Sequence, residues 1–252
     1  MIKLIISGCN GKMGRVVSSI VLNQSDIEVV AGFDINTETT FGYPVYKTPA
    51  ECPEKADVII DFSHPDLLES LLDYAVKTGT PLVECTTGLS EEQKAKMIEA
   101  SEKVPVFFSA NMSLGVNLLI ELAQRATKLL ADNFDIEIIE KHHNQKIDAP
   151  SGTALAIADG INDVLAERKE YVYDRHAVRK KRTQKEIGIH AIRGGTIVGE
   201  HSVIFAGKDE VVELKHEAMS KEIFAVGAVA AAKFVVGKPA KMYNMQDLVA
   251  EM

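Results

Sequence analysis

The first 110 residues alternate short apolar runs with segments of helical periodicity, and this alternation constrains the fold more than any other feature. Strands joined by helices of about ten or more residues are parallel, because a parallel connection requires a long crossover. Runs that are apolar at every position indicate strands buried on both faces of a sheet. We therefore predict an α/β fold with an N-terminal doubly wound, Rossmann-type parallel sheet. Its expected strands are residues 2–6, 28–33, 58–62, 80–84 and 104–108.

The pattern changes after residue 111 and indicates a second domain of α+β type, with a mixed or antiparallel sheet. Its expected elements are helices over residues 115–130 and 153–168, and strands over 134–140, 187–192, 201–206 and 210–216. We place a dinucleotide-binding domain at 1–112 and a substrate-binding and oligomerisation domain at 113–219. An alanine-rich helix over 220–236 and the tail to 252 are expected to rejoin the first domain, with hinges near 112 and 220.

The charge balance argues against a nucleic-acid partner. The chain of 252 residues carries 28 Lys and Arg against 36 Asp and Glu, a formal net charge of 28 − 36 = −8, and therefore repels polyphosphate overall. Its one basic run, residues 179–182 with Lys185, is short and has no interleaved aromatic side chains. We expect this run to be a solvated loop.

The apolar runs and the cysteines predict a cytoplasmic protein with no membrane partner. No run reaches the roughly 18 to 20 residues that span a bilayer, and the first one is too short for a signal peptide. Cys9, Cys52 and Cys85 are scattered and odd in number, which indicates reduced thiols. The lack of a Cys-x-x-Cys pair argues against a structural zinc site.

A glycine loop, Gly8-Cys9-Asn10-Gly11-Lys12-Met13-Gly14, lies between the first expected strand and the first expected helix. Glycines let the backbone turn tightly and approach a pyrophosphate, which the N–H groups at the start of the helix then bind. The spacing G-x-x-G-x-x-G differs from the usual G-x-G-x-x-G, so its position in the fold carries the prediction. An ordinary strand-to-helix turn is the alternative.

Asp34 supports dinucleotide binding, because it ends the second expected strand 20 residues after Gly14. An acid at this point accepts hydrogen bonds from the adenosine ribose and repels a 2′-phosphate, which slightly favours NADH. Lys12 or Arg15 could still bind that phosphate, so NADPH remains possible.

Polar residues follow the fourth and fifth expected strands, at the end of a parallel sheet where ligands bind. They form the segments Cys85-Thr86-Thr87-Gly88 and Ser109-Ala110-Asn111-Met112. Their hydroxyl and amide groups could contact the nicotinamide and its ribose. Capping of the helices that follow is an equally good interpretation.

The densest polar stretch, residues 140–153, joins a strand to a helix. His142, His143 and Lys146 gather positive charge for an anionic substrate, and one of them could donate a proton. Ser151-Gly152-Thr153 opens the next helix and predicts a carboxylate site. A metal site is the rival, but adjacent histidines in a strand point to opposite faces, so we predict none. A solvated polar loop is the other alternative.

Residues 140–154, with the sequence E-K-H-H-N-Q-K-I-D-A-P-S-G-T-A, closely resemble the signature of the dihydrodipicolinate (4-hydroxy-tetrahydrodipicolinate) reductase family. The resemblance covers the whole chain. Residues 8–15 match the family's cofactor loop, and 193–201 match a later strand and turn. Residues 85–88 resemble its Gly-Thr-Thr-Gly turn with Cys85 at the first glycine, and 109–117 resemble a further segment with Met112 in place of an aromatic residue.

This resemblance implies reduction of the dihydrodipicolinate-type substrate, a small dicarboxylate, by hydride transfer from NADH or NADPH, in lysine biosynthesis through diaminopimelate. His142 and Lys146 match the catalytic residues, both assigned as proton donors, and His143, Gly152 and Thr153 match the substrate site, to which the helix start adds Ser151. The family is typically a homotetramer assembled through its second domain. Cofactor contacts are implied for Gly8, Cys9, Asn10, Gly11, Lys12, Met13, Asp34, Cys85, Thr86, Thr87, Ser109, Ala110, Asn111 and Met112.

One residue departs from the family pattern, and two alternative functions remain. Ile35 stands where the family usually has a basic residue, which argues against a strong NADPH preference. A related dehydrogenase could use Cys85 as a thiol nucleophile, although no activating partner is visible. The alternative outside enzymes is a non-catalytic NAD(H)-sensing regulator.

Overall fold

The computed structural model describes residues 1–251, which form two compact units. The first unit contains residues 1–114 together with the chain from Glu222 onward, and the second contains Gly115–Lys221. Within the first unit, all six pairings of a seven-stranded sheet are parallel, in the order β12-β6-β5-β4-β1-β2-β3. The Rossmann-type prediction is confirmed. The strands are β1 (Ile2–Ser7), β2 (Ile27–Phe33), β3 (Val45–Tyr46), β4 (Val58–Asp61), β5 (Leu82–Glu84), β6 (Val106–Phe108) and β12 (Met242–Tyr243).

The strand order places the ligand-binding edge of this sheet. From β1 the chain proceeds outward to β2 and β3, and then returns to β4 on the other side of β1 and continues to β5 and β6. The order therefore reverses between β1 and β4, and the crevice beyond the carboxyl ends of these strands is where such sheets bind ligands. The sequence pattern did not predict β3 and β12, because a strand of two residues has no detectable periodicity.

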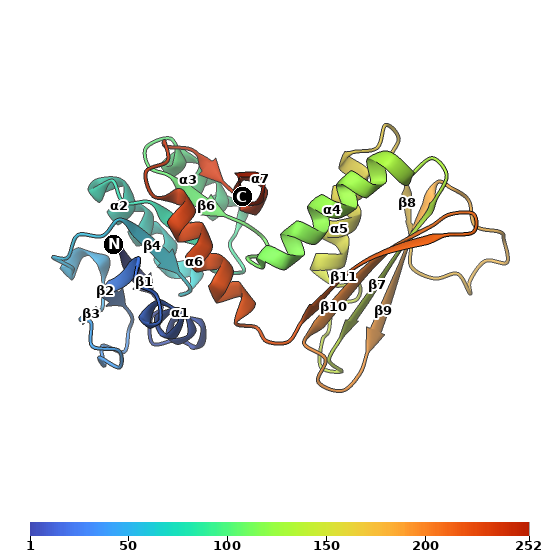
Figure 1. Cartoon of the computed structure of the whole chain (residues 1–252). Helices are drawn as coiled ribbons and strands as arrows, with labels where there is room; N and C mark the ends of the chain where they lie inside the picture. Colours follow the sequence, from blue (N-terminus) through green and yellow to red (C-terminus); the bar gives the residue numbers. More distant parts are fainter. Residues whose placement is uncertain (252) are drawn as a thin grey trace. The chain divides into compact units, whose positions relative to one another are not determined.

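Helices cover both faces of the parallel sheet (Figure 1). One core contains side chains of α1 and α6, and the core on the opposite face contains side chains of α2 and α3. The helices of this unit are α1 (Lys12–Leu22), α2 (Leu68–Thr78), α3 (Glu91–Ser101), α6 (Ile223–Val235) and α7 (Met245–Glu251), with 3-10 turns at Pro49–Glu51 and Pro65–Leu67.

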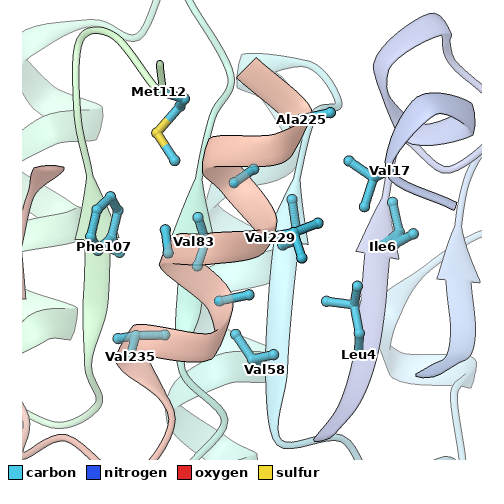
Figure 2. Packing of buried hydrophobic residues seen from close by; sticks show 14 of the residues in the cluster. Leu4, Ile6, Val17, Val58, Val83, Phe107, Met112, Ala225, Val229 and Val235 are labelled. Carbon is cyan, nitrogen blue, oxygen red and sulfur yellow. The ribbon is translucent and has the colours of Figure 1, made fainter. Parts of the chain in front are cut away.

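The alanine-rich helix α6 packs tightly in the first core. Figure 2 shows Ala225, Val229 and Val235 facing side chains of β1, β4 and β5. Its small side chains let the helix approach neighbouring segments of the first unit closely. At Gly227 the approach is closest, because a Cβ there would lie 1.6 Å from the carbonyl oxygen of Met112.

The second unit contains a five-stranded mixed sheet in the order β11-β10-β7-β9-β8. Its helices, α4 (Leu114–Leu130) and α5 (Gly152–Asp163), pack with β7, β9 and β10 in one core, and both lie on the same face of the sheet (Figure 1). The strands are β7 (Asp135–His142), β8 (Glu170–Val172), β9 (Glu186–Arg193), β10 (Gly199–Ala206) and β11 (Val211–Ala218).

The mixed form of the predicted sheet is confirmed, and the purely antiparallel form is wrong. β9 runs parallel to β7, while β10 runs antiparallel to β7 on its other side. The physical reason is the long connection through α5, which returns the chain to the same end of the sheet. Helix α5 ends at Asp163, five residues before the predicted end, and the Asn162 side chain bonds the backbone of Lys169 where the chain turns toward β8.

Among the described residues, none of the helices combines the length and the apolar character needed to cross a membrane.

The close contact at Gly227 predicts that Gly227→Ala lowers the free energy of unfolding by about 1–3 kcal/mol, because the added methyl group must displace backbone. Val226→Ala, at a half-exposed position of the same helix, is the matched control. Urea unfolding of both variants tests this, and equal stabilities would contradict the packing described.

Candidate active site

The buried face of β7 is apolar in its first half and polar at its end. Ile136, Ile138, Glu140 and His142 lie at alternate positions and are all buried. Alternate positions of a strand share one face, so the two polar side chains continue the face that packs against α5. The turn after β9 passes over the end of β7, where the Gly194 amide donates to the His142 carbonyl.

Glu140 is the centre of a polar cluster and is fully buried. Its Oε2 contacts the His142 Nδ1 at 2.7 Å and accepts from Arg193 Nη1 at 2.7 Å. Its Oε1 accepts from Arg193 Nη2 at 2.7 Å and from the Ser151 amide at 3.0 Å. Burial alone raises the pKa of a carboxyl, but the bonds from Arg193, His142 and Ser151 bring the pKa of Glu140 below its ordinary value. Glu140 is therefore a buried, paired carboxylate.

An ionised Glu140 fixes the orientation of His142. A carboxylate only accepts hydrogen bonds, so the Nδ1 of His142 carries a proton and donates it. The Nε2 is then the nitrogen available to a ligand. Gly199 leaves room beside it, because a Cβ at that position would lie 3.1 Å from Nε2.

His201 lies beside His142, with the two rings edge to face and their centroids 5.2 Å apart. Its Nε2 is 2.9 Å from the Ser151 hydroxyl. Burial, followed by repulsion from His142, lowers the pKa of His201 to about 4. This side chain is therefore neutral at neutral pH.

The start of α5 has features that favour an anion. Ser151 is the N-cap, and its hydroxyl accepts from the Ala154 amide at 3.1 Å. No acidic residue occupies the first turn, which begins with Gly152 and Thr153. The partial positive charge of a helix N-terminus favours a carboxylate at this place.

His143 and Lys146 lie in the loop between β7 and α5. The Lys146 Nζ is 2.8 Å from Asp148 Oδ1, and its amide donates to the His143 carbonyl. Arg193 also donates to the Asp148 carbonyl at 2.7 Å, so one guanidinium ties this loop to Glu140. His143 is partly buried, and its Nδ1 has no hydrogen-bond partner within the described part of the chain.

The glycine loop fits a pyrophosphate. Gly8 has φ +73°, and a Cβ there would lie 2.5 Å from the Phe62 carbonyl oxygen. A Cβ at Gly14 would lie 2.2 Å from the Gly8 carbonyl oxygen, so only glycine permits this turn. Helix α1 begins after Gly11 with neither a side-chain cap nor an acidic residue in its first turn, which leaves its N–H groups for an anion.

The other residues predicted at the cofactor site differ in whether their side chains are accessible to a ligand. The Asp34 carboxylate accepts a hydrogen bond from the backbone N–H of Asn10 at 2.9 Å, which connects Asp34 to the glycine loop. Thr87 is exposed and Thr86 is buried. The side chains of Cys9 and Met112 are buried in the core, so a cofactor contact from either would come from its backbone.

The surroundings of Asn111 and Cys85 bear on two alternative interpretations. The Asn111 side-chain oxygen accepts the Ser113 backbone amide at 2.9 Å, a local turn before α4 begins at Leu114. Burial raises the pKa of the Cys85 thiol well above its ordinary value, which disfavours its use as a nucleophile. Within residues 1–251, no group of three or more His, Cys, Asp and Glu side chains is arranged to hold a metal ion.

Sequence reasoning assigned no role to Glu140, Arg193 or His201. The period-two alternation of β7 was a usable signal for Glu140, because it places this residue on the face of His142. For Arg193 and His201 the one signal was the match of residues 193–201 to the family, because the pairing of β9 and β10 with β7 cannot be read from one sequence.

The chain is similar to known proteins over nearly its whole length. Residues 2–112 match the family described as dihydrodipicolinate reductase, N-terminus, and residues 115–249 match its C-terminus. A 4-hydroxy-tetrahydrodipicolinate reductase of Caldanaerobacter subterraneus subsp. tengcongensis is 55% identical over 99% of this chain and 98% of its own. The corresponding Clostridium novyi protein is 50% identical with the same coverage.

Solved structures show the same likeness. The dipicolinate-bound dihydrodipicolinate reductase from Paenisporosarcina sp. TG-14 aligns with a TM-score of 0.83 and 25% identity, over 98% of this chain and 99% of that one. A probable dehydrogenase from Thermotoga maritima, with a TM-score of 0.65 and 11% identity over 98% and 92% of the two chains, shares the fold. The curated relatives are named as enzymes, which supports the predicted reductase over the alternative of a non-catalytic regulator. The chain belongs to the dihydrodipicolinate reductase family and is an NAD(P)H-dependent oxidoreductase of lysine biosynthesis through diaminopimelate.

Proposed function

We propose that the first unit binds NADH or NADPH and that the second unit binds the dicarboxylate substrate and supplies the proton for its reduction. The observation that carries the proposal is Glu140, which holds His142 and Arg193 beside the N-terminus of α5. When bound, NAD(P)H supplies the hydride. The proposed boundaries of the two functional domains remain 1–112 with 220–252, and 113–219.

The cofactor site is proposed at the carboxyl ends of β1, β2, β5 and β6. Backbone N–H groups of the glycine loop would bind the pyrophosphate, and Asp34 would accept hydrogen bonds from the adenosine ribose. The segments after β5 and β6 would contact the nicotinamide end. The proposed contacts are Gly8, Cys9, Asn10, Gly11, Lys12, Met13, Asp34, Cys85, Thr86, Thr87, Ser109, Ala110, Asn111 and Met112.

The substrate site is proposed around the start of α5. One carboxylate would bind the Ser151-Gly152-Thr153 turn, where the backbone N–H groups and the helix dipole favour an anion. His143 and Lys146 would bind the other carboxylate, since both belong to the loop that Arg193 ties to the cluster. The similar protein from Paenisporosarcina sp. TG-14 binds dipicolinate, which is consistent with a dicarboxylate at such a site.

Protonation is the step that this chain must provide. Hydride addition to a carbon conjugated with C=N moves electron density onto the ring nitrogen, which then takes up a proton. Glu140 holds the His142 ring by Nδ1, so a proton delivered by His142 would leave from Nε2 of the doubly protonated ring. We propose His142 and Lys146 as the catalytic residues, either of which can deliver the proton. A positioned acid of this kind contributes about 10²–10⁴ in rate.

We expect His142→Gln and Lys146→Ala each to lower kcat by at least ~10²-fold, because each removes a proton donor or a stabilising charge. NADH binding, followed by fluorescence titration, should remain intact, since these residues belong to the second unit. Turnover near the wild-type rate in both variants would refute the assignment.

We further propose a slight preference for NADH. Asp34 follows β2, and a carboxylate at this position repels the 2′-phosphate of NADPH. Ile35 is 85% exposed and offers no charge to that phosphate.

Ile35→Arg should therefore increase the ratio of kcat/KM for NADPH to kcat/KM for NADH by ~10-fold, through a charge-assisted bond to the 2′-phosphate. Leu22→Arg adds the same charge at an exposed position at the end of α1 and serves as the control. If both variants change the ratio equally, the effect is one of net charge and not of this site.

The low pKa of His201 makes the stability of the protein depend on pH. The unfolded chain takes up a proton at His201 near pH 6.5, but the folded chain takes it up only near pH 4. Between these values the unfolded state binds more protons, so acidification favours unfolding by at most about 1.4 kcal/mol per pH unit.

We therefore expect His201→Gln to flatten the decrease in unfolding free energy from pH 6.5 to about pH 5, as measured by urea unfolding. His176→Gln, which changes an exposed histidine of the same unit, should keep the wild-type slope. A wild-type slope in the His201 variant would contradict the buried, neutral state.

We also propose that the protein is a homotetramer assembled through its second unit, and that it works in the cytoplasm, where NAD(P)H is available. The edge strand β11 pairs only with β10 and exposes Val211 and Val212. An unpaired edge with exposed apolar side chains is a common site of association.

A further inference from the structure

Two buried carboxyl groups lie side by side at the carboxyl ends of β4 and β5. Asp61 and Glu84 are both fully buried, and they are direct partners in the parallel register of these strands. Neighbouring strands are about 4.8 Å apart, and partner residues point to the same face. That face also carries Ile59 and Leu82, which belong to the apolar core beneath α2 and α3.

Both carboxyl groups bind the same residue of the turn that follows β5. The Thr86 amide donates to Glu84 Oε1 at 2.7 Å, and the Thr86 hydroxyl donates to Asp61 Oδ2 at 2.8 Å. The other Asp61 oxygen accepts from the Ser63 amide at 3.2 Å. The pair thus connects the loop after β4 with the turn after β5.

One oxygen of the pair remains unexplained by these bonds. Glu84 Oε2 is buried and receives no hydrogen bond from the described residues. Two buried carboxylates at partner positions of neighbouring strands repel each other, which favours a proton on one of them. Burial, followed by the proximity of Asp61, raises the pKa of Glu84 well above its ordinary value.

We propose that Glu84 keeps its proton and donates it from Oε2 to Asp61, and that this carboxylic acid–carboxylate pair positions the Thr86–Thr87 turn for the cofactor. Glu84 and Asp61 are positioning residues, because they act through Thr86. The second part of the proposal rests on the proposed role of this turn in cofactor binding.

The proposed proton gives every oxygen of the pair a partner. Glu84 Oε1 accepts from the turn while Oε2–H donates to Asp61, and Asp61 in turn accepts from Thr86 and Ser63. Thr86 is then held by both its amide and its hydroxyl, which leaves Thr87 exposed at the carboxyl end of β5. The loss of the proton would place two like charges together and release the turn.

Two substitutions at Glu84 separate the proton from the shape of the side chain. Glu84→Gln keeps an acceptor for Thr86 and supplies an N–H donor to Asp61, so the KM for NADH should stay within about twofold of wild type. Glu84→Leu fills the volume but has no polar atom, and should raise this KM ~10-fold while kcat changes much less. An equal increase in both variants, or none in Glu84→Leu, would overturn the proposal.

An infrared difference spectrum detects the proton directly. At neutral pH, wild-type protein minus Glu84→Gln should show the C=O stretch of one protonated carboxylic acid, with or without cofactor. The absence of this band would overturn the proposal even if the leucine variant fails to fold.

A substitution at Thr87 separates the proposed positioning of the turn from the proposed proton on Glu84. Thr87→Val should raise the KM for NADH if the turn contacts the cofactor. If this KM is unchanged, the positioning role falls together with the proposed role of the turn, whereas the infrared band still decides whether Glu84 holds a proton.

Discussion

The buried carboxylate of Glu140 is the interaction on which the proposed chemistry depends. It accepts two hydrogen bonds from Arg193, one from His142 and one from the amide of Ser151. A charge without such partners would be expelled from the interior, and removing one partner of a buried pair is strongly destabilising. One carboxylate thus sets the ring of His142, the loop before α5 and the first residue of that helix.

In the first unit, the shape of the glycine loop is set mainly by contacts of the backbone and not by side chains. At Gly8 and Gly14 the neighbouring carbonyl oxygens occupy the space that a Cβ would need, so the turn between β1 and α1 is fixed by sterics. The uncapped helix start then provides N–H groups at the edge where the strand order reverses.

The sequence predicted the elements that have strong periodicity. It also singled out candidate site residues that lie close together in the chain. The parallel sheet, α1, α4 and the polar segment before α5 follow from local patterns. The insertion of β7 between β9 and β10 does not, because strand order depends on contacts between distant residues. For the same reason the sequence could name His142 and Lys146 but not Arg193, which reaches Glu140 from a strand more than 50 residues later.

We propose as the central point that the cluster around Glu140 binds the dicarboxylate substrate. A crystal structure of the protein with NADH and dipicolinate tests this most directly. We expect one carboxylate of dipicolinate on the N–H groups at the start of α5, with its ring beside His142 Nε2. Dipicolinate bound elsewhere, with no contact to His142, Lys146 or the Ser151–Thr153 turn, would contradict the account.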